Sequence, residues 1–312
     1  MSTIYNDIHS VKRKEIVLMK TALQDFLTYM SEIKNASVNT VISYRNDLTK
    51  LMRHLENQNI IDADKISETS LNSYVLTIER EGMSPATVSR NIASIKAFIF
   101  YLIKKGSLHE DPTERMKAPK VEKKPPHTLS KEQINGLLEQ PNTVSKKGIR
   151  DKAMLELLYA TGIRVTELIT IRLEDVNLKN RYIRCCNSNK ERIIPFGNMA
   201  KQALETYFLK VRTELLGKME SNICFTNLSG EPMSRQGFWK IIKSYGKTAG
   251  IQDEITPQIF RHSFAVHMME NGADIHSVQE LLGHSDVATT QLYMQGRKGK
   301  IRDVYESAHP RA

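Results

Sequence analysis

Apolar side chains recur at helical spacing through the first hundred residues of the chain. Behind Ser37, which is suited to be a helix N-cap, one face carries Val41, Tyr44, Leu48, Leu51, Met52 and Leu55. Similar faces occur over residues 17–30 and 71–78, and Ser84-Pro85 begins a fourth helix with a cap and a proline at its first position. The pattern predicts a four-helix bundle over residues 15–105. It holds no cluster of catalytic side chains, which favours a binding module.

Residues 106–127 interrupt this helical pattern. Proline disfavours helix at its own position and at the one before it. The segment contains Pro112, Pro119, Pro125 and Pro126, together with Lys117, Lys120, Lys123 and Lys124. We expect an extended basic linker here. Its charge suits contact with a phosphate backbone, and a solvated tether would have the same composition.

A second domain, residues 128–312, begins with a helix-start signal. Ser130 and Gln133 have the spacing of a capping box. Further helices are predicted over residues 151–160, 165–169, 200–216, 235–249, 258–271 and 275–282, with glycines at the C-cap positions 162, 272 and 283. Residues 182–185 and 192–194 read as a hairpin. The predicted fold is therefore mainly α with a small β-hairpin.

Charge and cysteine usage narrow the class of protein. The 312 residues include 45 Lys and Arg against 35 Asp and Glu, a net charge of +10, which favours polyanionic partners such as nucleic acid. The three cysteines have no metal-binding spacing, so neither a disulfide nor a zinc site is expected. No apolar run is long enough for a membrane span, and the N-terminus lacks the apolar core of a secretory signal. We therefore expect a cytoplasmic protein with no membrane partner.

Four side chains of the second domain suit chemistry on a phosphodiester. Arg164, Arg261, His284 and Tyr293 occur in that order. Two arginines can clamp a phosphate and neutralise the charge that builds on its non-bridging oxygens in the transition state. A tyrosine oxygen can attack phosphorus and hold a strand covalently, which conserves the bond energy without a nucleotide cofactor. The set predicts phosphoryl transfer that needs neither cofactor nor metal.

Each of these residues also has a purely structural interpretation. Arg164 follows a glycine that ends a helix, where an arginine can simply bond the terminal carbonyls. Arg261 lies in a helix with apolar neighbours, and a surface arginine is the default there. His284 stands beside a helix cap, and a single tyrosine such as Tyr293 is most often a surface aromatic. No single residue is specific, so the ordered set carries the argument.

The motifs around this set resemble those of the tyrosine recombinases of the lambda-integrase family, above all the Xer-type recombinases of bacteria. Ala-Thr-Gly-Ile-Arg-Val-Thr-Glu-Leu at 160–168 is similar to the family's first-arginine box. Leu-Leu-Gly-His-Ser-Asp at 281–286 and Thr-Thr-Gln-Leu-Tyr at 289–293 resemble its histidine and tyrosine box. Residues 39–48 and 84–88 resemble its N-terminal domain, and the final His-Pro-Arg-Ala looks Xer-like. The resemblance covers most of the chain.

The resemblance implies a fold, residue roles and partners. It implies an N-terminal four-helix SAM-like core-binding domain and a C-terminal catalytic domain that form a clamp around DNA. Arg164 and Arg261 would bind the scissile phosphate, and His284 would donate a hydrogen bond or carry a proton. Tyr293 would form a 3′-phosphotyrosyl link and release a 5′-hydroxyl. The implied partners are double-stranded DNA with a specific recombination site and a homo-tetramer on two duplexes, or a related recombinase; a C-terminal helix near residues 300–308 would pack onto a neighbouring subunit.

Two family positions are not matched. The family's hairpin lysine, which is thought to protonate the leaving 5′-oxygen, falls eight residues before the closing proline, and counting back from Pro195 gives Asn187. The nearest lysine is Lys190. Gln258 stands where the family usually has His or Lys, three residues before Arg261, and it can donate a hydrogen bond but not carry charge. Lys190 and Gln258 are therefore auxiliary candidates.

Three explanations of the missing lysine stay open. The hairpin shifts so that Lys190 supplies the acid, the site works with a reduced set at a cost of ~10²–10⁴-fold in rate, or cleavage has been lost. Because the ordered set of four is complete, we favour an active site-specific recombinase that serves dimer resolution, cointegrate resolution or mobile-element integration. The alternatives are a cleavage-impaired DNA-binding protein on the same scaffold and a type IB topoisomerase-like relaxing enzyme.

Overall fold

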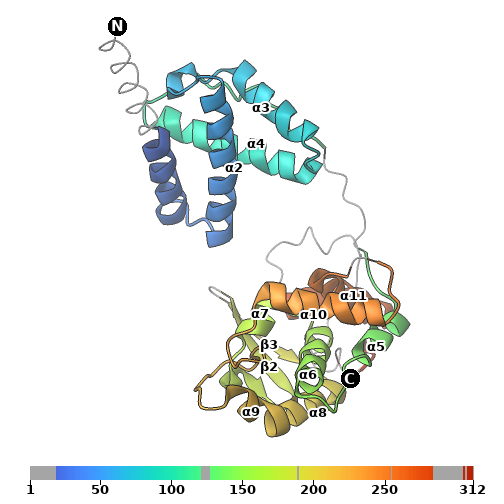
Figure 1. The fold of residues 1–312 in the computed structure, drawn as a ribbon. Coiled ribbons are helices and arrows are strands. Elements are labelled where there is room, and N and C mark those ends of the chain that lie inside the picture. The colour runs from blue at the N-terminus through green and yellow to red at the C-terminus, as the bar shows by residue number, and fades with distance from the viewer. Residues whose placement is uncertain are drawn as a thin grey trace. The chain divides into compact units, whose positions relative to one another are not determined.

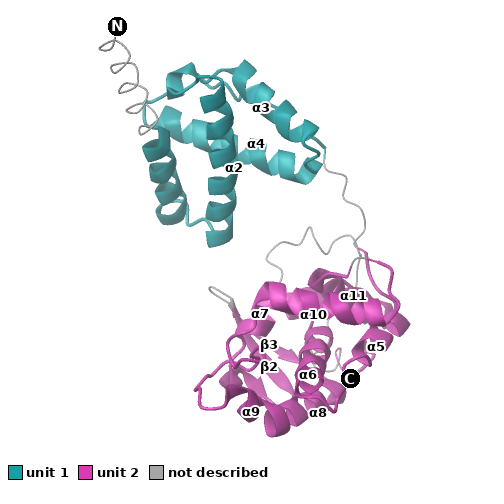
Figure 2. Cartoon of the chain, viewed as in Figure 1, with its two compact units in different colours: residues 1–124 teal, residues 125–312 magenta. Residues whose placement is uncertain are grey.

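The chain divides into two compact units, residues 1–124 and 125–312 (Figure 2). The computed structural model describes residues 19–120, 127–253, 255–283, 305 and 308–311, apart from residues 188–189 and the side chains of 187 and 190. Helices predominate in both units (Figure 1). No helix within the described part of the chain has both the length and the apolar character that a membrane crossing requires.

Four helices form the first unit. Residues 19–32 are helical, and they are followed by α2 (Val38–Asn57), α3 (Glu68–Arg80) and α4 (Pro85–Lys104). Ser37 and Ser84 begin α2 and α4, because their side chains accept hydrogen bonds from the backbone N–H groups of Thr40 and Thr87. The apolar faces meet in one core that includes Phe26, Leu48, Leu51, Tyr74, Ile95 and Phe98. The four-helix prediction is confirmed.

The second unit is mainly helical around one small antiparallel sheet. Its helices are α5 (Lys131–Leu138), α6 (Lys146–Thr161), α7 (Val165–Thr170), α8 (Asn198–Tyr207), α9 (Thr213–Leu216), α10 (Arg235–Thr248), α11 (Pro257–Glu270) and α12 (Ile275–Leu282). A π-helical turn, Phe208–Arg212, joins α8 to α9, so the single helix predicted over 200–216 is interrupted. The mainly α fold class with a small β element is confirmed.

The sheet has one strand more than the predicted hairpin. Its order is β1 (Val176–Asn177), β2 (Tyr182–Asn187) and β3 (Lys190–Pro195), and each neighbouring pair is antiparallel. Strand β1 was not predicted, because two residues are too few to show an alternating pattern.

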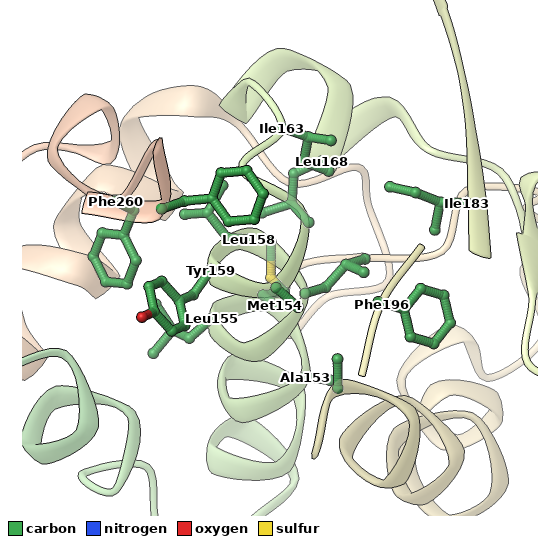
Figure 3. Packing of buried hydrophobic residues seen from close by; sticks show 14 of the residues in the cluster. Ala153, Met154, Leu155, Leu158, Tyr159, Ile163, Leu168, Ile183, Phe196 and Phe260 are labelled. Atoms are coloured by element: carbon green, nitrogen blue, oxygen red, sulfur yellow. The ribbon is translucent and has the colours of Figure 1, made fainter. Parts of the chain in front are cut away.

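Helix α6 forms the centre of the second unit. Its side chains are buried along most of its length, and it packs against α8 and α11. Figure 3 shows Leu155, Leu158 and Tyr159 of this helix among Ile183 of β2 and Phe260 of α11. Full burial of a side chain of this size stabilises the fold by about 1.5–3 kcal/mol, so α6 fixes the position of the loop at its C-terminal end.

The few charged residues buried on α6 are paired. Asp151 accepts hydrogen bonds from Arg150, and its carboxylate lies 3.1 Å from the Lys147 ammonium. Glu156 binds the Arg311 guanidinium through both carboxylate oxygens, at 3.1 and 2.6 Å. A buried charge without such a partner would be strongly destabilising. Arg311 therefore stabilises the central helix by pairing with its buried Glu156 carboxylate.

Residues close to the C-terminus lie in the core of the second unit. Tyr305 and Ala308 are each only 1% exposed, and the Tyr305 ring stacks on His309. His309 Nε2 donates to the Tyr159 carbonyl at 3.3 Å, and its Nδ1 accepts from the Arg311 backbone N–H at 3.1 Å. Most of the helix expected over residues 300–308 lies outside the described residues. The described members, Tyr305 and Ala308, are buried within this same chain.

His309 is expected to make the second unit sensitive to acid. Burial first, and then the charge of Arg311, lower the pKa of His309 to about 4, although its bond to Tyr159 opposes the shift. The unfolded chain binds a proton as pH falls below about 6.5, whereas the folded chain stays neutral until about 4, so stability is lost as pH falls through this window. We predict that wild type loses about 2 kcal/mol more than His309→Gln between about pH 7.5 and pH 5.

Urea unfolding of the second unit at several pH values measures this difference. His267, whose pKa burial also lowers, contributes to the same window in both proteins and therefore cancels in the comparison. Parallel stability curves for wild type and His309→Gln would contradict the assignment.

Candidate active site

The site begins at the C-terminal end of the central helix. Helix α6 ends at Gly162, which has φ 59° and donates its N–H to the Leu158 carbonyl. A Cβ atom at this position would lie 2.5 Å from the Phe264 ring, so both the left-handed conformation and the close contact require glycine. The chain then reverses, and α7 begins directly behind Arg164. The turn thus places Arg164 beside the end of α6.

Arg261 is buried against two helix ends. It projects from α11, is 7% exposed, and donates to the carbonyls of Gly162 at 2.7 Å and Leu282 at 2.6 Å. The structural interpretation of Arg261 as a surface arginine is therefore wrong. Two of its five N–H donors are used in these bonds, and no described residue accepts from the other three.

Arg261 has lost most of its contact with solvent, and it lies close to two other arginines. Loss of solvent, followed by repulsion from Arg164 and Arg192, lowers the pKa of Arg261 to about 9 despite attraction from Glu167. The guanidinium is still charged at neutral pH. A bound anion would stabilise the charged guanidinium, since it would replace part of the lost solvation.

Arg164 is held less tightly than Arg261. Its guanidinium donates to Glu167 Oε1 and to the Gly283 carbonyl, both at 3.4 Å, and 41% of the side chain is exposed. Both bonds are long, so an incoming phosphate would compete with them readily. The helix end that Arg164 contacts belongs to α12 and not to α6, the preceding helix.

Three arginines converge on the C-terminal end of α12. Arg192 of β3 donates from Nε to the Leu281 carbonyl at 3.0 Å, next to the carbonyls that bind Arg261 and Arg164. The last carbonyls of a helix have no partner within the helix and carry partial negative charge. The end of α12 therefore gathers cations from three elements distant in the sequence. Gly283 ends the helix with φ 63°, and His284 follows it in the sequence.

Glu167 balances this cluster from α7. It accepts from the Arg164 backbone N–H at 2.7 Å and from Arg192 Nη2 at 2.9 Å. Burial alone would raise its pKa, but the hydrogen bonds from Arg192 and Arg164 outweigh burial and lower the pKa of Glu167. Its carboxylate is thus ionised at neutral pH, and it binds the guanidinium groups of both Arg164 and Arg192.

Neither Glu167 nor Arg192 was identified from the sequence as a site residue. The spacing of Arg164 and Glu167, which matches a helix-start pair, was one available signal. The other was strand alternation. Ile194 is buried and Ile193 is 57% exposed, so Arg192 lies on the buried face of β3, where a charged residue requires a partner.

The other predicted residues are placed only in part. His284 and Tyr293 lie outside the described residues. Gln258 lies on α11, one turn before Arg261, and is exposed. Lys190 begins β3 directly across from Asn187 of β2. Over the described part of the chain, no group of His, Cys, Asp or Glu side chains is arranged to hold a metal ion.

The described half of the site has the composition that an anion site requires. Arg164, from the turn before α7, and Arg261, from α11, both bind carbonyls at the end of α12. Such a pair can bind a phosphate through parallel N–H bonds and stabilise additional charge on its oxygens.

Comparison with known proteins gives the family. Residues 127–299 match the model of the phage integrase family, and residues 23–106 match the phage integrase N-terminal SAM-like domain. The chain is 43% identical over 295 residues to tyrosine recombinase XerD of Staphylococcus haemolyticus, which covers 94% of this chain and all of the relative. It is 41% identical over 299 residues to tyrosine recombinase XerD of Oceanobacillus iheyensis, covering 95% of this chain and all of the relative.

Two solved structures share the fold. The XerH recombinase bound to its difH substrate aligns with a TM-score of 0.68 at 20% identity, over 87% of this chain and 81% of that one. A lambda integrase dimer bound to a core site aligns with a TM-score of 0.69 at 17% identity, over 90% and 99% of the two chains. These likenesses show the fold, and the family-model and sequence matches show that the chain belongs to the phage integrase family of tyrosine recombinases.

Proposed function

We propose that this chain is a site-specific DNA recombinase that cleaves and rejoins strands through Tyr293. One observation carries the proposal: Arg164 and Arg261 meet at the end of α12, and the next residue in the sequence is His284. The chain is also 43% identical over nearly its whole length to a tyrosine recombinase. Two members of the ordered set thus meet at one helix end, in a chain that belongs to the family whose motifs they match.

The chemistry of this set is a reversible phosphoryl transfer. The Tyr293 oxygen forms a bond to phosphorus as it gives up its proton, and the bond from phosphorus to the 5′-oxygen breaks. The electron pair leaves with that oxygen, which takes up a proton. Arg164 and Arg261 hold the non-bridging oxygens, and His284 donates a hydrogen bond to them or carries a proton. A 5′-hydroxyl of the partner strand then attacks the phosphotyrosine and releases Tyr293.

Lys190 is the proposed acid for the leaving 5′-oxygen. It is the cross-strand partner of Asn187, which occupies the position of the family's lysine. This pairing supports replacement of the family's lysine by the residue opposite its position on β3, rather than a shift in the register of the hairpin. Gln258, one turn before Arg261, is proposed to donate a neutral hydrogen bond to the phosphate.

The proposed partner is double-stranded DNA that carries a recombination site. The XerH and lambda integrase neighbours are each described as bound to DNA sites, and the net charge of +10 suits the same ligand. We further propose that the two units clamp the duplex and that four copies act on two duplexes. If the C-terminal helix expected near residues 300–308 packs onto a neighbouring subunit, it would have to leave Tyr305 and Ala308 in the core of their own chain or release them from it.

The first test is formation of a covalent adduct. Duplexes selected from a random-sequence pool by binding to the chain supply the site, and nicks at successive positions trap the cleaved strand. We expect wild type to give a denaturation-resistant protein–DNA adduct that Tyr293→Phe abolishes without weakening binding. Binding without an adduct would favour the cleavage-impaired alternative. An adduct with Tyr293→Phe would refute the nucleophile. Relaxation of any supercoiled plasmid by dilute monomer would favour the topoisomerase-like alternative.

The second test concerns Lys190. We predict that Lys190→Ala slows cleavage of an ordinary phosphodiester by ~10²–10⁴-fold, as loss of a general acid does. A 5′-bridging phosphorothiolate leaves as a thiolate and needs no proton, so it should restore the rate. Single-turnover cleavage of both substrates measures the effect, and Lys179→Ala, an exposed lysine outside the hairpin strands, is the control. An unchanged rate on the ordinary substrate would exclude Lys190 as the acid.

The third test separates the two arginines by stability. Arg261→Met leaves the carbonyls of Gly162 and Leu282 without their donor, and we expect it to lower the free energy of unfolding by about 2–4 kcal/mol. Arg164→Met removes a half-exposed side chain with two long bonds and should cost less than about 1 kcal/mol. Both should abolish cleavage. Urea unfolding of the second unit checks the contrast, and equal losses of stability would contradict the different anchoring of the two side chains.

A further inference from the structure

Arg192 is a buried cation of β3 for which the proposed chemistry has no role. Its side chain is 10% exposed, and it stands on the same face of the strand as the fully buried Ile194. Across the hairpin its partner is Cys185, which is also buried. An arginine on the inner face of a small sheet is tolerated only when its guanidinium is bound on several sides.

The guanidinium of Arg192 joins three elements of the second unit. Nη2 binds Glu167 of α7 at 2.9 Å, and Nε binds the Leu281 carbonyl of α12 at 3.0 Å. The backbone of Arg192 is fixed in β3 by pairing with β2. The side chain is therefore a direct connection between the hairpin, the turn that carries Arg164, and the last turn of α12.

Gly283 provides the space for this connection. A Cβ atom at Gly283 would lie 2.9 Å from Arg192 Nη1 and 3.0 Å from its Cδ and Cζ. The flat face of the guanidinium thus rests on the backbone that links α12 to His284. The glycine serves the left-handed turn and this close approach at once.

The contacts of Arg192 differ from those of a phosphate ligand. Arg164 is 41% exposed and bonded at 3.4 Å, so it is free to turn toward an anion, whereas Arg192 is nearly enclosed and its bonds are about 3 Å long. Two of the three Arg192 contacts are to the end of α12. These contacts suit a side chain that holds the end of α12 in place and does not turn away from it to bind a ligand.

We infer that Arg192 is a positioning residue, which holds the C-terminal turn of α12 at a fixed place relative to the Arg164–Glu167 turn. The inference rests on the proposed function, because the end of α12 matters for strand cleavage only if His284 and the two phosphate-binding arginines act together. Arg192 itself touches no reacting atom in this assignment. Its loss displaces groups that do, while the surfaces that bind DNA elsewhere on the chain stay intact.

A displacement of this kind reduces the rate and leaves binding in place. Misplacement of catalytic groups by about 1 Å can lower a rate on the order of 10²-fold. We therefore expect Arg192→Met to cleave nicked duplex about 10²-fold more slowly than wild type at saturating DNA, with DNA affinity unchanged within about twofold. Arg192→Lys keeps the charge but cannot bind Leu281 and Glu167 as a planar fork, and we expect an intermediate rate.

Arg212→Met is the matched control. Arg212 also binds backbone carbonyls in the second unit, those of Ser221, Ile223 and Cys224, and none of these belongs to the site. Its loss should reduce stability about as much as the loss of Arg192 and leave the cleavage rate near that of wild type. Thermal unfolding shows whether each variant is folded at the assay temperature. If Arg192→Met is not folded, Arg192→Lys carries the test.

Single-turnover cleavage of an ordinary and a 5′-bridging phosphorothiolate substrate decides the matter. Because Arg192 acts on the phosphate side of the site, its defect should persist on the phosphorothiolate. Full rescue there would overturn the inference, since it would place the effect on the acid for the leaving group. A wild-type rate for Arg192→Lys, or for a folded Arg192→Met, would also overturn it. Failure of wild type to form any adduct would instead contradict the proposed function.

Discussion

The site depends on one physical constraint, the unsatisfied carbonyl groups at the end of α12. The carbonyls of Leu281, Leu282 and Gly283 each accept from a different arginine, and these arginines come from β3, α11 and the turn before α7. Partial negative charge at a helix end offsets part of the cost of bringing three cations together. Glu167 adds a full negative charge to the cluster. Among the described residues of the cluster positive groups outnumber negative ones, which would favour the binding of a phosphate.

Two glycines make this convergence sterically possible. Gly162 lets Phe264 and Leu282 approach the end of α6, and Gly283 lets Arg192 lie on the backbone after α12. Both have positive φ, so each helix ends abruptly and exposes its last carbonyls to the arginines. The motif Thr-Gly-Ile-Arg and the motif Leu-Leu-Gly-His thus have a shared physical meaning. In each, a helix stops so that charge can be placed against its end.

The sequence was sufficient for most of the helices and singled out Arg164 and Arg261, which the structure brings to the same helix end. It was insufficient for the groups that surround these two arginines. Ser37, Ser84 and Ser130 mark helix starts through local bonds that a short window of sequence contains. One partner of Arg261 lies 99 residues away in the chain, and one partner of Arg192 lies 89 residues away. Apolar spacing carries no information on which carbonyl a buried cation meets. For this reason the burial of Arg261 was missed, as were Arg192 and Glu167. Strand β1 was not predicted because its two residues are too few to show an alternating pattern.

A crystal structure of Tyr293→Phe bound to its uncleaved recombination site tests the central claim most directly. The scissile phosphate should lie at the end of α12, with guanidinium nitrogens of Arg164 and Arg261 within about 3 Å of its non-bridging oxygens. Arg192 should still bind the Leu281 carbonyl and Glu167. A scissile phosphate remote from both arginines would contradict the account, and so would a direct bond from Arg192 to that phosphate.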